Sequence, residues 1–220
     1  MFDAIAERYD RLNRILSFGL DQGWRRKTLK TIGLENNHRV LDIATGTGDL
    51  AILEASTSAS VVGLDPSQNM LDVAQRKVDS DSLSEKVELV LGDAQALPFE
   101  DDSFDRITIA FGIRNVPDRL LGLQEMARVL KPGGKVGILE LNEPEKGLLS
   151  SGARFYIRQV VPRIGAMLSG AKEYRYLQES IAEFPNQTRF LEMMKDAGFS
   201  TAEAHRLSFG VCTLFVGRKD

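Results

Sequence analysis

The sequence predicts an α/β fold in which a mainly parallel β-sheet is covered by helices on both faces. From residue 38 to residue 141, apolar strand-like runs alternate with helical stretches, which is typical of parallel strands joined by crossover helices. The first run, 39–43, leads into a turn of small residues that contains Gly46 and Gly48. A strand that ends in such a turn at a helix start is typical of nucleotide-type cofactor sites, because no Cβ keeps the ligand from bare backbone N–H groups.

The expected elements follow in order. Residues 1–33 are expected to be helical and to cap the cofactor site, because apolar residues recur at helical spacing until Gly19 interrupts the pattern. Strands are expected at 39–43, 60–64, 87–91, 105–110 and 135–140, and helices at about 49–56, 67–79 and 118–130. The last of these helices should stop at Lys131-Pro132-Gly133-Gly134, which then forms a turn.

The second half of the chain departs from this alternation and then returns to it. Residues 142–185 are interpreted as an insertion that covers the substrate side. A helix at about 186–197 and strands near 202–208 and 211–218 complete the chain as a hairpin. We therefore expect one domain over residues 1–220, with a cofactor-binding core at 38–141.

Composition excludes several kinds of protein. The net charge of −3 gives no sign of nucleic-acid binding, and the single cysteine, Cys212, excludes an internal disulfide and is expected to lie buried in a strand. His38 and His205 are too far apart to suggest a zinc site, so no metal is expected. No signal peptide and no apolar run of membrane-spanning length are found, so we expect a cytoplasmic protein.

Two acidic residues bear on the identity of the cofactor. Asp65 ends the second strand, where a carboxylate can accept both ribose hydroxyls of either a dinucleotide or S-adenosylmethionine. The pattern Gly46-x-Gly48-x-x-Ala51 also fits dinucleotide sites loosely, so it does not decide between them. Asp93 ends the third strand, where its carboxylate can accept a bond from an adenine amine.

Five parallel strands followed by a terminal hairpin resemble the Rossmann-like seven-stranded sheet of class I S-adenosylmethionine-dependent methyltransferases. Ala96-Leu97-Pro98-Phe99, before the fourth strand, and Arg128 to Gly134, before the fifth, support the resemblance. The alternative is an NAD-binding or cofactor-free Rossmann domain whose acidic residues are solvated caps.

The chain resembles the ubiquinone/menaquinone biosynthesis C-methyltransferase family over almost its whole length. Three segments carry the resemblance: Tyr9-Asp10-Arg11-Leu12-Asn13 with Ser17 and Trp24, Phe111-Gly112-Ile113-Arg114-Asn115, and Tyr174-Arg175-Tyr176-Leu177 with Ser180-Ile181 and Phe184-Pro185. It implies S-adenosylmethionine as the cofactor and a prenylated quinol as the acceptor.

The resemblance and the glycine turn together give ten candidate cofactor-binding residues. They are Asp42, Ala44, Gly46, Thr47, Gly48, Asp65, Met70, Asp93, Ala94 and Ala110. Two positions depart from the family pattern: Ala110 stands where a serine is common, and Asp21 stands where a histidine often precedes Trp24 by three residues.

Methylation of a quinol ring carbon needs a group that favours the phenolate and a group that accepts the ring proton. Arg114 and Asn115, just after the fourth strand, are the candidate catalytic residues, and the resemblance supports them. The alternatives are an ion pair of Arg114 with Asp118 or Glu140, and a helix cap by Asn115. His205 is the less favoured candidate base. Candidate substrate-pocket residues are Tyr9, Phe111, Tyr174 and Tyr176.

The insertion has a second interpretation. Arg154, Arg158 and Arg163 alternate there with apolar residues, as in segments that lie on an anionic membrane, although a lid helix with solvated arginines explains the pattern equally well. We expect at most peripheral membrane contact, and a homodimer is left open.

The sequence thus favours C-methylation of demethylmenaquinol, or of the methoxy-benzoquinol that precedes ubiquinone. The alternatives are methylation of another small or lipid acceptor, such as a phospholipid amine, and a binding module without activity.

Overall fold

A seven-stranded mixed sheet forms the centre of the molecule. The computed structural model describes residues 14, 17–57, 60–142 and 179–220. Its strands are β1 (Arg39–Ile43), β2 (Ser60–Asp65), β3 (Val87–Leu91), β4 (Phe104–Ala110), β5 (Leu130–Leu141), β6 (Thr201–Leu207) and β7 (Cys212–Arg218). They lie in the order β3-β2-β1-β4-β5-β7-β6, and only the pairs of β7 with β5 and with β6 are antiparallel. The predicted five parallel strands and terminal hairpin are therefore confirmed.

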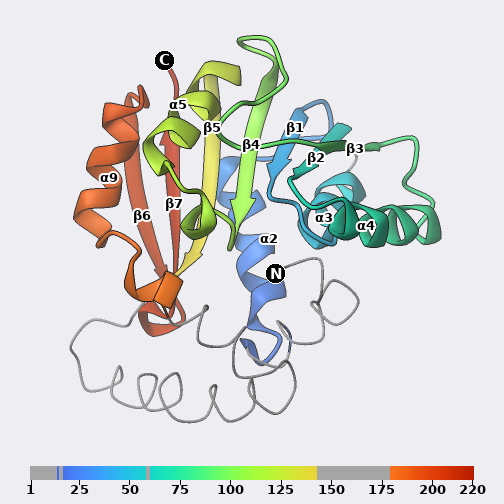
Figure 1. Cartoon of the computed structure of the whole chain (residues 1–220), viewed down its shortest axis with the longest axis horizontal. Helices are drawn as coiled ribbons and strands as arrows, with labels where there is room; N and C mark the ends of the chain where they lie inside the picture. Colours follow the sequence, from blue (N-terminus) through green and yellow to red (C-terminus); the bar gives the residue numbers. More distant parts are fainter. Residues whose placement is uncertain (1–13, 15–16, 58–59, 143–178) are drawn as a thin grey trace.

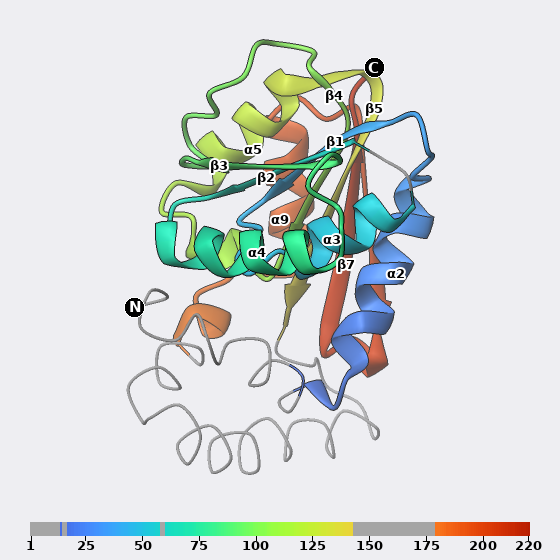
Figure 2. The same cartoon turned by 90° about the vertical axis from the view of Figure 1, so that its right-hand side faces the viewer.

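Helices cover both faces of the sheet (Figures 1 and 2). They are α2 (Leu20–Ile32), α3 (Asp49–Ser56) and α4 (Gln68–Ser80) on one face, and α5 (Arg119–Val129) and α9 (Gln187–Asp196) on the other. The short turns η2 (Ile113–Asn115) and η4 (Ser208–Gly210) follow β4 and β6.

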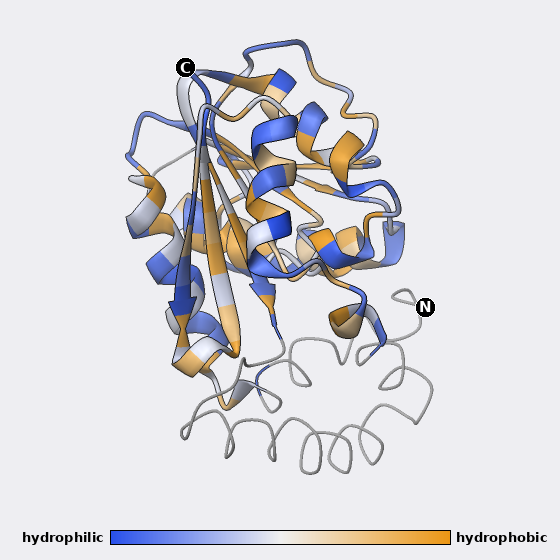
Figure 3. Cartoon of the chain, turned by 90° about the vertical axis from the view of Figure 1, so that its left-hand side faces the viewer, coloured by the Kyte–Doolittle hydropathy of each residue, from blue (hydrophilic) through white to orange (hydrophobic). Residues whose placement is uncertain are grey.

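The two faces have separate apolar cores, because successive residues of a strand point to opposite sides. Leu41 and Ile43 of β1 belong to a cluster with Phe190 of α9, whereas Val40, which directly precedes Leu41, belongs to a cluster with Ala51 of α3. Figure 3 shows the hydrophobic colour along the inner strands and hydrophilic residues on the helices that cover them.

Helix α2 joins the N-terminal part of the chain to the sheet. It begins directly after Gly19, whose φ of 73° is left-handed, so the predicted interruption is where the helix starts. Trp24 is buried, stacks edge-on against Phe111 at 6.2 Å between ring centroids, and donates from Nε1 to Ser208 Oγ at 2.8 Å. The helix is thus fixed against both the end of β4 and the β6–β7 turn.

One strand boundary was predicted wrongly. Strand β5 begins at Leu130, five residues before the expected start, because Leu130 pairs with Phe104 at the end of the sheet. The register then shifts so that Arg106 pairs with Lys135, and the expected turn at Gly133 lies inside the strand as an irregularity with φ of 78°.

Some predictions fall outside the described residues. These are the substrate-pocket residues Tyr9, Tyr174 and Tyr176, and the basic segment with Arg154, Arg158 and Arg163. Within the described ranges, no helix is both long and apolar enough to cross a membrane.

Candidate active site

A pocket lies at the carboxyl ends of β1, β2 and β4. Strands β1 and β4 are neighbours, and their following helices, α3 and α5, lie on opposite faces of the sheet. Such a reversal of strand order opens a crevice in which α/β proteins bind their ligands. The pocket has a volume of about 280 Å³ and is lined by Ile43, Ala44, Gly46, Leu64, Asp65, Pro66, Ser67, Met70, Asp93, Ala94, Gln95, Ala110, Phe111, Gly112, Asn115, Val116 and Pro117.

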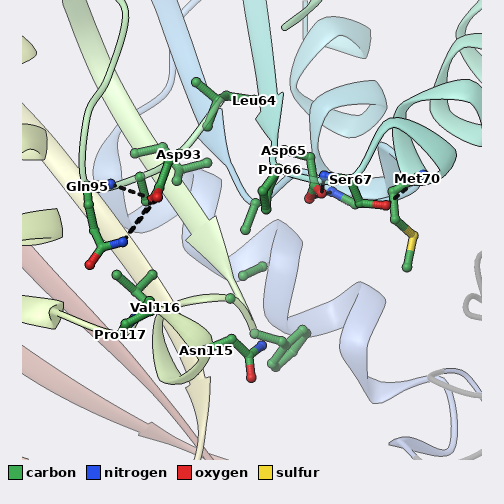
Figure 4. A pocket seen from close by; sticks show the side chains of 17 residues that line it. Leu64, Asp65, Pro66, Ser67, Met70, Asp93, Gln95, Asn115, Val116 and Pro117 are labelled. Atoms are coloured by element: carbon green, nitrogen blue, oxygen red, sulfur yellow. Dashed lines mark hydrogen bonds between the residues drawn. The ribbon is translucent and has the colours of Figure 1, made fainter. Parts of the chain in front are cut away.

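Seven of the ten candidate cofactor residues line this pocket: Ala44, Gly46, Asp65, Met70, Asp93, Ala94 and Ala110. In Figure 4, Asp65 and Met70 lie on one side, Asp93 and Gln95 on another, and Asn115 at a third. Residues more than 70 positions apart in sequence therefore surround a single space.

We expected the glycine turn to present bare N–H groups to a ligand, but three of its N–H groups donate within the protein. The N–H of Thr45 donates to Leu64 O at 3.0 Å, that of Gly46 to Asp65 Oδ2 at 2.8 Å, and that of Gly48 to Thr45 O at 2.9 Å. These bonds occupy the donors with which a dinucleotide fold would bind a pyrophosphate. These three N–H groups are therefore not free to bind a phosphate group.

The two glycines of the turn have different tasks. Gly46, with φ of 58°, faces the pocket, and a Cβ built there would meet no protein atom within 4 Å. Gly48, with φ of 80°, precedes α3 and faces Ala74 of α4, whose Cβ would lie 3.1 Å from an added Cβ. Gly46 thus allows close approach of a ligand, whereas Gly48 allows close packing of two helices.

Asp65 and Asp93 have different surroundings. Asp65 is buried, and it accepts bonds from Gly46 N–H on Oδ2 and from Ser67 N–H, at 2.9 Å, on Oδ1. Asp93 is exposed, and its carboxylate accepts bonds from the N–H and the amide of Gln95 at 2.9 to 3.2 Å. Gln95 also accepts from the N–H of Asp118 at 2.9 Å, so it connects the Asp93 side of the pocket to the start of α5.

A second, smaller cavity of about 20 Å³ adjoins the pocket and shares Ala44, Gly46 and Ala110 with it. Two further candidates, Asp42 and Thr47, line it. Because Ala110 borders both cavities and its side chain is a methyl group, only the backbone can form hydrogen bonds to a ligand at this position.

Arg25 of α2, which sequence reasoning missed, also lines the small cavity. It is 7% exposed, lies 3.8 Å from the Asp21 carboxylate through Nε, and stacks over Phe111 at 5.5 Å from the ring centroid. Asp21 is buried and accepts from Ser17 Oγ at 2.8 Å. Asp21 therefore holds a cation beside the small cavity.

A buried carboxyl pair lies behind this cavity. Thr108 Oγ1 lies 3.1 Å from Asp42 Oδ1 and 2.7 Å from Glu54 Oε1, and Asp42 Oδ2 accepts from Thr45 Oγ1 at 2.7 Å. Burial raises the pKa of Asp42 to about 6 and raises the pKa of Glu54 well above its usual value. The sequence signal for Glu54 is weak: it follows the apolar run from Leu50 to Leu53 in helix α3, which also begins with the acid Asp49.

Arg114 lies beside the pocket but not among its lining residues. Its Nη1 is 2.6 Å from Glu140 Oε1 and also donates to Phe111 O at 2.6 Å, and both members of the pair are buried. The ion pair with Glu140, one of the alternatives drawn from the sequence, is therefore present. Asn115 lines the pocket. It does not cap α5, because the side chain that accepts from the N–H of Leu121 at the start of this helix is that of Asp118.

The other titratable candidates lie away from the pocket. His205 is on the edge strand β6, 3.2 Å from the Glu203 carboxylate, and does not line the pocket. Cys212 is buried in β7, as predicted, and burial raises the pKa of its thiol. No cluster of His, Cys, Asp or Glu suited to a metal ion is found in the described ranges.

Comparisons with known proteins agree with this geometry. A sequence model of the ubiE/COQ5 methyltransferase family matches residues 1–219. A ubiquinone/menaquinone biosynthesis C-methyltransferase UbiE from Geotalea daltonii is 46% identical over 222 residues, which cover 100% of this chain and 94% of the relative. A demethylmenaquinone methyltransferase from Deinococcus radiodurans is 46% identical over 100% of this chain and 91% of that relative.

Solved structures show the same fold. An S-adenosylmethionine-dependent methyltransferase from Aquifex aeolicus superposes with a TM-score of 0.65 at 21% identity, over 88% of each chain. Phosphoethanolamine N-methyltransferase 2 from Haemonchus contortus, in complex with S-adenosylmethionine, superposes with a TM-score of 0.71 at 20% identity, over 100% of this chain and 60% of that one. At these identities the likeness supports the fold alone.

Proposed function

The chain belongs to the ubiE/COQ5 methyltransferase family and is an S-adenosylmethionine-dependent methyltransferase, and we propose that it methylates a ring carbon of a prenylated quinol. Demethylmenaquinol is the first choice of substrate, and the methoxy-benzoquinol that precedes ubiquinone is the second. The observation that carries the proposal is the match over residues 1–219 together with 46% identity to two proteins of these names.

The pocket residues fit the cofactor. When bound, S-adenosylmethionine supplies an electrophilic methyl group on a sulfonium. We assign Asp65 to the ribose hydroxyls, Asp93 with Ala94 to the adenine, and Met70 to the apolar contact beside them. Asp42 and Thr47 would hold the polar methionyl end, since both line the small cavity next to Gly46.

The acceptor ring would lie at the end of the pocket formed by the residues after β4. Phe111 supplies an aromatic edge there, and the Asn115 amide can orient a ring oxygen or a water molecule that accepts the ring proton. Arg114 is proposed to stabilise the phenolate, and its buried pair with Glu140 fixes the turn that carries Asn115. Packing of the acceptor ring against these groups would align the attacking ring carbon with the methyl group and exclude water.

We also propose peripheral membrane contact through the basic segment with Arg154, Arg158 and Arg163, which lies outside the described residues. A prenylated acceptor would give such contact a reason, since its tail is held in the bilayer. Flotation of the protein with vesicles containing anionic lipid, compared with vesicles of neutral lipid, tests it.

The function is tested by transfer of a labelled methyl group from S-adenosylmethionine to three acceptors in parallel: reduced demethylmenaquinone, the prenylated methoxy-benzoquinol, and phosphoethanolamine. We expect the wild type to transfer label to a quinol. Asn115→Ala should transfer label at only a small fraction of the wild-type rate. Label only in phosphoethanolamine, or in none of the three despite cofactor binding, would overturn the proposed acceptor.

A further inference from the structure

Two buried carboxyl groups behind the cofactor pocket share one hydroxyl. Thr108 Oγ1 of β4 lies within hydrogen-bond distance of Glu54 Oε1 and Asp42 Oδ1, at 2.7 and 3.1 Å. Asp42 is 1% exposed, and Glu54 and Thr108 are fully buried. A hydroxyl group has one proton to donate, so two ionised carboxylates cannot both be satisfied by it. The cluster therefore needs an additional proton on one of the two acids.

The surroundings indicate which acid carries that proton. Asp42 has a second donor in the hydroxyl of Thr45, whereas Glu54 Oε2 has no hydrogen-bond partner within the described part of the chain. An unpaired buried oxygen costs less free energy on a neutral acid than on a carboxylate. Among the described residues, Arg25 of α2 is the cation that acts on both acids, and the Asp65 carboxylate of β2 adds negative charge at Asp42. Glu54 is therefore the acid that stays neutral.

We propose that Glu54 is a positioning residue: a neutral acid that donates a hydrogen bond to the Thr108 hydroxyl, so that this hydroxyl can donate its own hydrogen bond to the Asp42 carboxylate. The direction of the bonds is then fixed along one chain, from Glu54 Oε1 through Thr108 Oγ1 to Asp42 Oδ1. The consequence is an ionised Asp42 held at the small cavity, where the proposed cofactor presents its ammonium group. This inference rests on the proposed function for the role of Asp42, but the protonation of Glu54 does not depend on it.

A neutral Glu54 serves the site better than a second anion. Two carboxylates that share a buried hydroxyl raise one another's pKa, so an ionised Glu54 would favour the neutral form of Asp42. A neutral acid supplies the same hydrogen bond without that charge. Glutamine at this position can also donate to Thr108, which provides a near-isosteric test.

The first test is the infrared difference spectrum of the cofactor-free wild type against Glu54→Gln at neutral pH. We expect a carbonyl stretch of a protonated carboxylic acid in the wild type that the variant lacks. Glu88→Gln, which replaces an exposed acid of β3, serves as the control and should remove only carboxylate bands. If the Glu54 variant likewise loses only carboxylate bands, Glu54 is ionised and the inference is wrong.

The second test measures S-adenosylmethionine binding by calorimetry. Glu54→Gln should keep the wild-type affinity within roughly threefold, because the donor to Thr108 is retained. Thr108→Val should weaken binding by about tenfold or more, because the charged Asp42 loses a hydrogen bond, and the pH at which binding is lost should become higher. Thr108→Ser should restore both the affinity and its pH dependence. A large loss in Glu54→Gln, or none in a folded Thr108→Val, would contradict the inference.

The two tests separate the inference from the proposed function. If the wild type failed to bind S-adenosylmethionine, the proposed function would fall, and the infrared bands would still report whether Glu54 is neutral. If Thr108→Val did not fold, the infrared spectrum and affinity of Glu54→Gln would decide the question alone.

Discussion

The guanidinium of Arg114 and the carboxylate of Glu140 form an ion pair closed off from solvent, with Nη1 and Oε1 2.6 Å apart. Glu140 Oε2 also accepts the backbone N–H of Arg114 at 3.2 Å, and Arg114 Nη1 donates to the carbonyl of Phe111 at 2.6 Å. Phe111 has a φ of 61°, which is costly for an aromatic residue. The pair therefore holds a strained turn at the edge of the pocket.

Glu140→Gln should lower the free energy of unfolding by about 3–5 kcal/mol, because it leaves the Arg114 charge buried without its counterion. Urea unfolding at neutral pH measures this loss. The matched control is Glu192→Gln, which removes one member of the exposed pair with Arg189 on α9, where the two side chains are 56% and 58% exposed. That change should stay within about 0.5 kcal/mol of the wild type. Equal losses of unfolding free energy in the two variants would mean that the buried ion pair stabilises the protein no more than the exposed one.

Gly112 separates the turn after β4 from the turn after β1. A Cβ at this position would lie 2.6 Å from the Cβ of Ala44, whose own φ is 51°. Gly112→Ala should therefore destabilise the protein by about 1–3 kcal/mol and also weaken cofactor binding, because both turns border the pocket. Gly23→Ala is the control, since the exposed Gly23 in α2 has no atom within 4 Å of an added Cβ. It should stabilise the helix by roughly 0.5–1 kcal/mol.

Substitution of Asp93 tests the proposed adenine end of the pocket. Its carboxylate is held by Gln95 and faces solvent, so Asp93→Ala should leave the free energy of unfolding nearly unchanged and weaken S-adenosylmethionine binding by about tenfold. Calorimetric titration measures the loss. Asp79→Ala, on the exposed surface of α4, should bind the cofactor like the wild type. An unchanged affinity in the Asp93 variant would remove this residue from the adenine site.

The strands were predictable to within a few residues because each is a short apolar run bounded by turn residues. The start of β5 was not, since its first pair with Phe104 depends on a register shift that no local pattern signals. The pocket could be predicted from the order of strands and acids: Asp65 ends β2, Asp93 follows the neighbouring β3, and parallel strands end at one edge of the sheet.

The sequence did not predict how the donors of the glycine turn pair, and it offered the ion pair of Arg114 with Glu140 only as an alternative. The N–H of Gly46 donates to Asp65, which is 19 residues away, and Arg114 pairs with Glu140, which is 26 residues away on β5. Glu54 had no motif at all, because its environment is created by Thr108 of β4 and Arg25 of α2. Such pairings arise only when the sheet brings distant segments together.

The raised pKa of Glu54 predicts a pH-dependent stability difference. In the folded protein its pKa lies well above the ordinary value of 4.5, so between these two pKa values the folded state binds more protons than the unfolded state. The contribution of Glu54 to the free energy of unfolding of the wild type must therefore fall as the pH rises above 4.5. Glu54→Gln has no proton to lose, so its stability relative to the wild type should increase with pH by up to about 1.4 kcal/mol per pH unit.

Urea unfolding of the wild type and of Glu54→Gln, from about pH 5 to about pH 8, measures this difference. The contribution of Asp42, whose pKa is raised to about 6 by burial, acts in the same direction in both proteins and changes only through its coupling to Glu54. Glu88→Gln provides the comparison, because its side chain is exposed and its curve should run parallel to that of the wild type. A gap between wild type and Glu54→Gln that stays constant with pH would mean that Glu54 titrates alike in the folded and unfolded chains, and its burial would then have no effect on its proton.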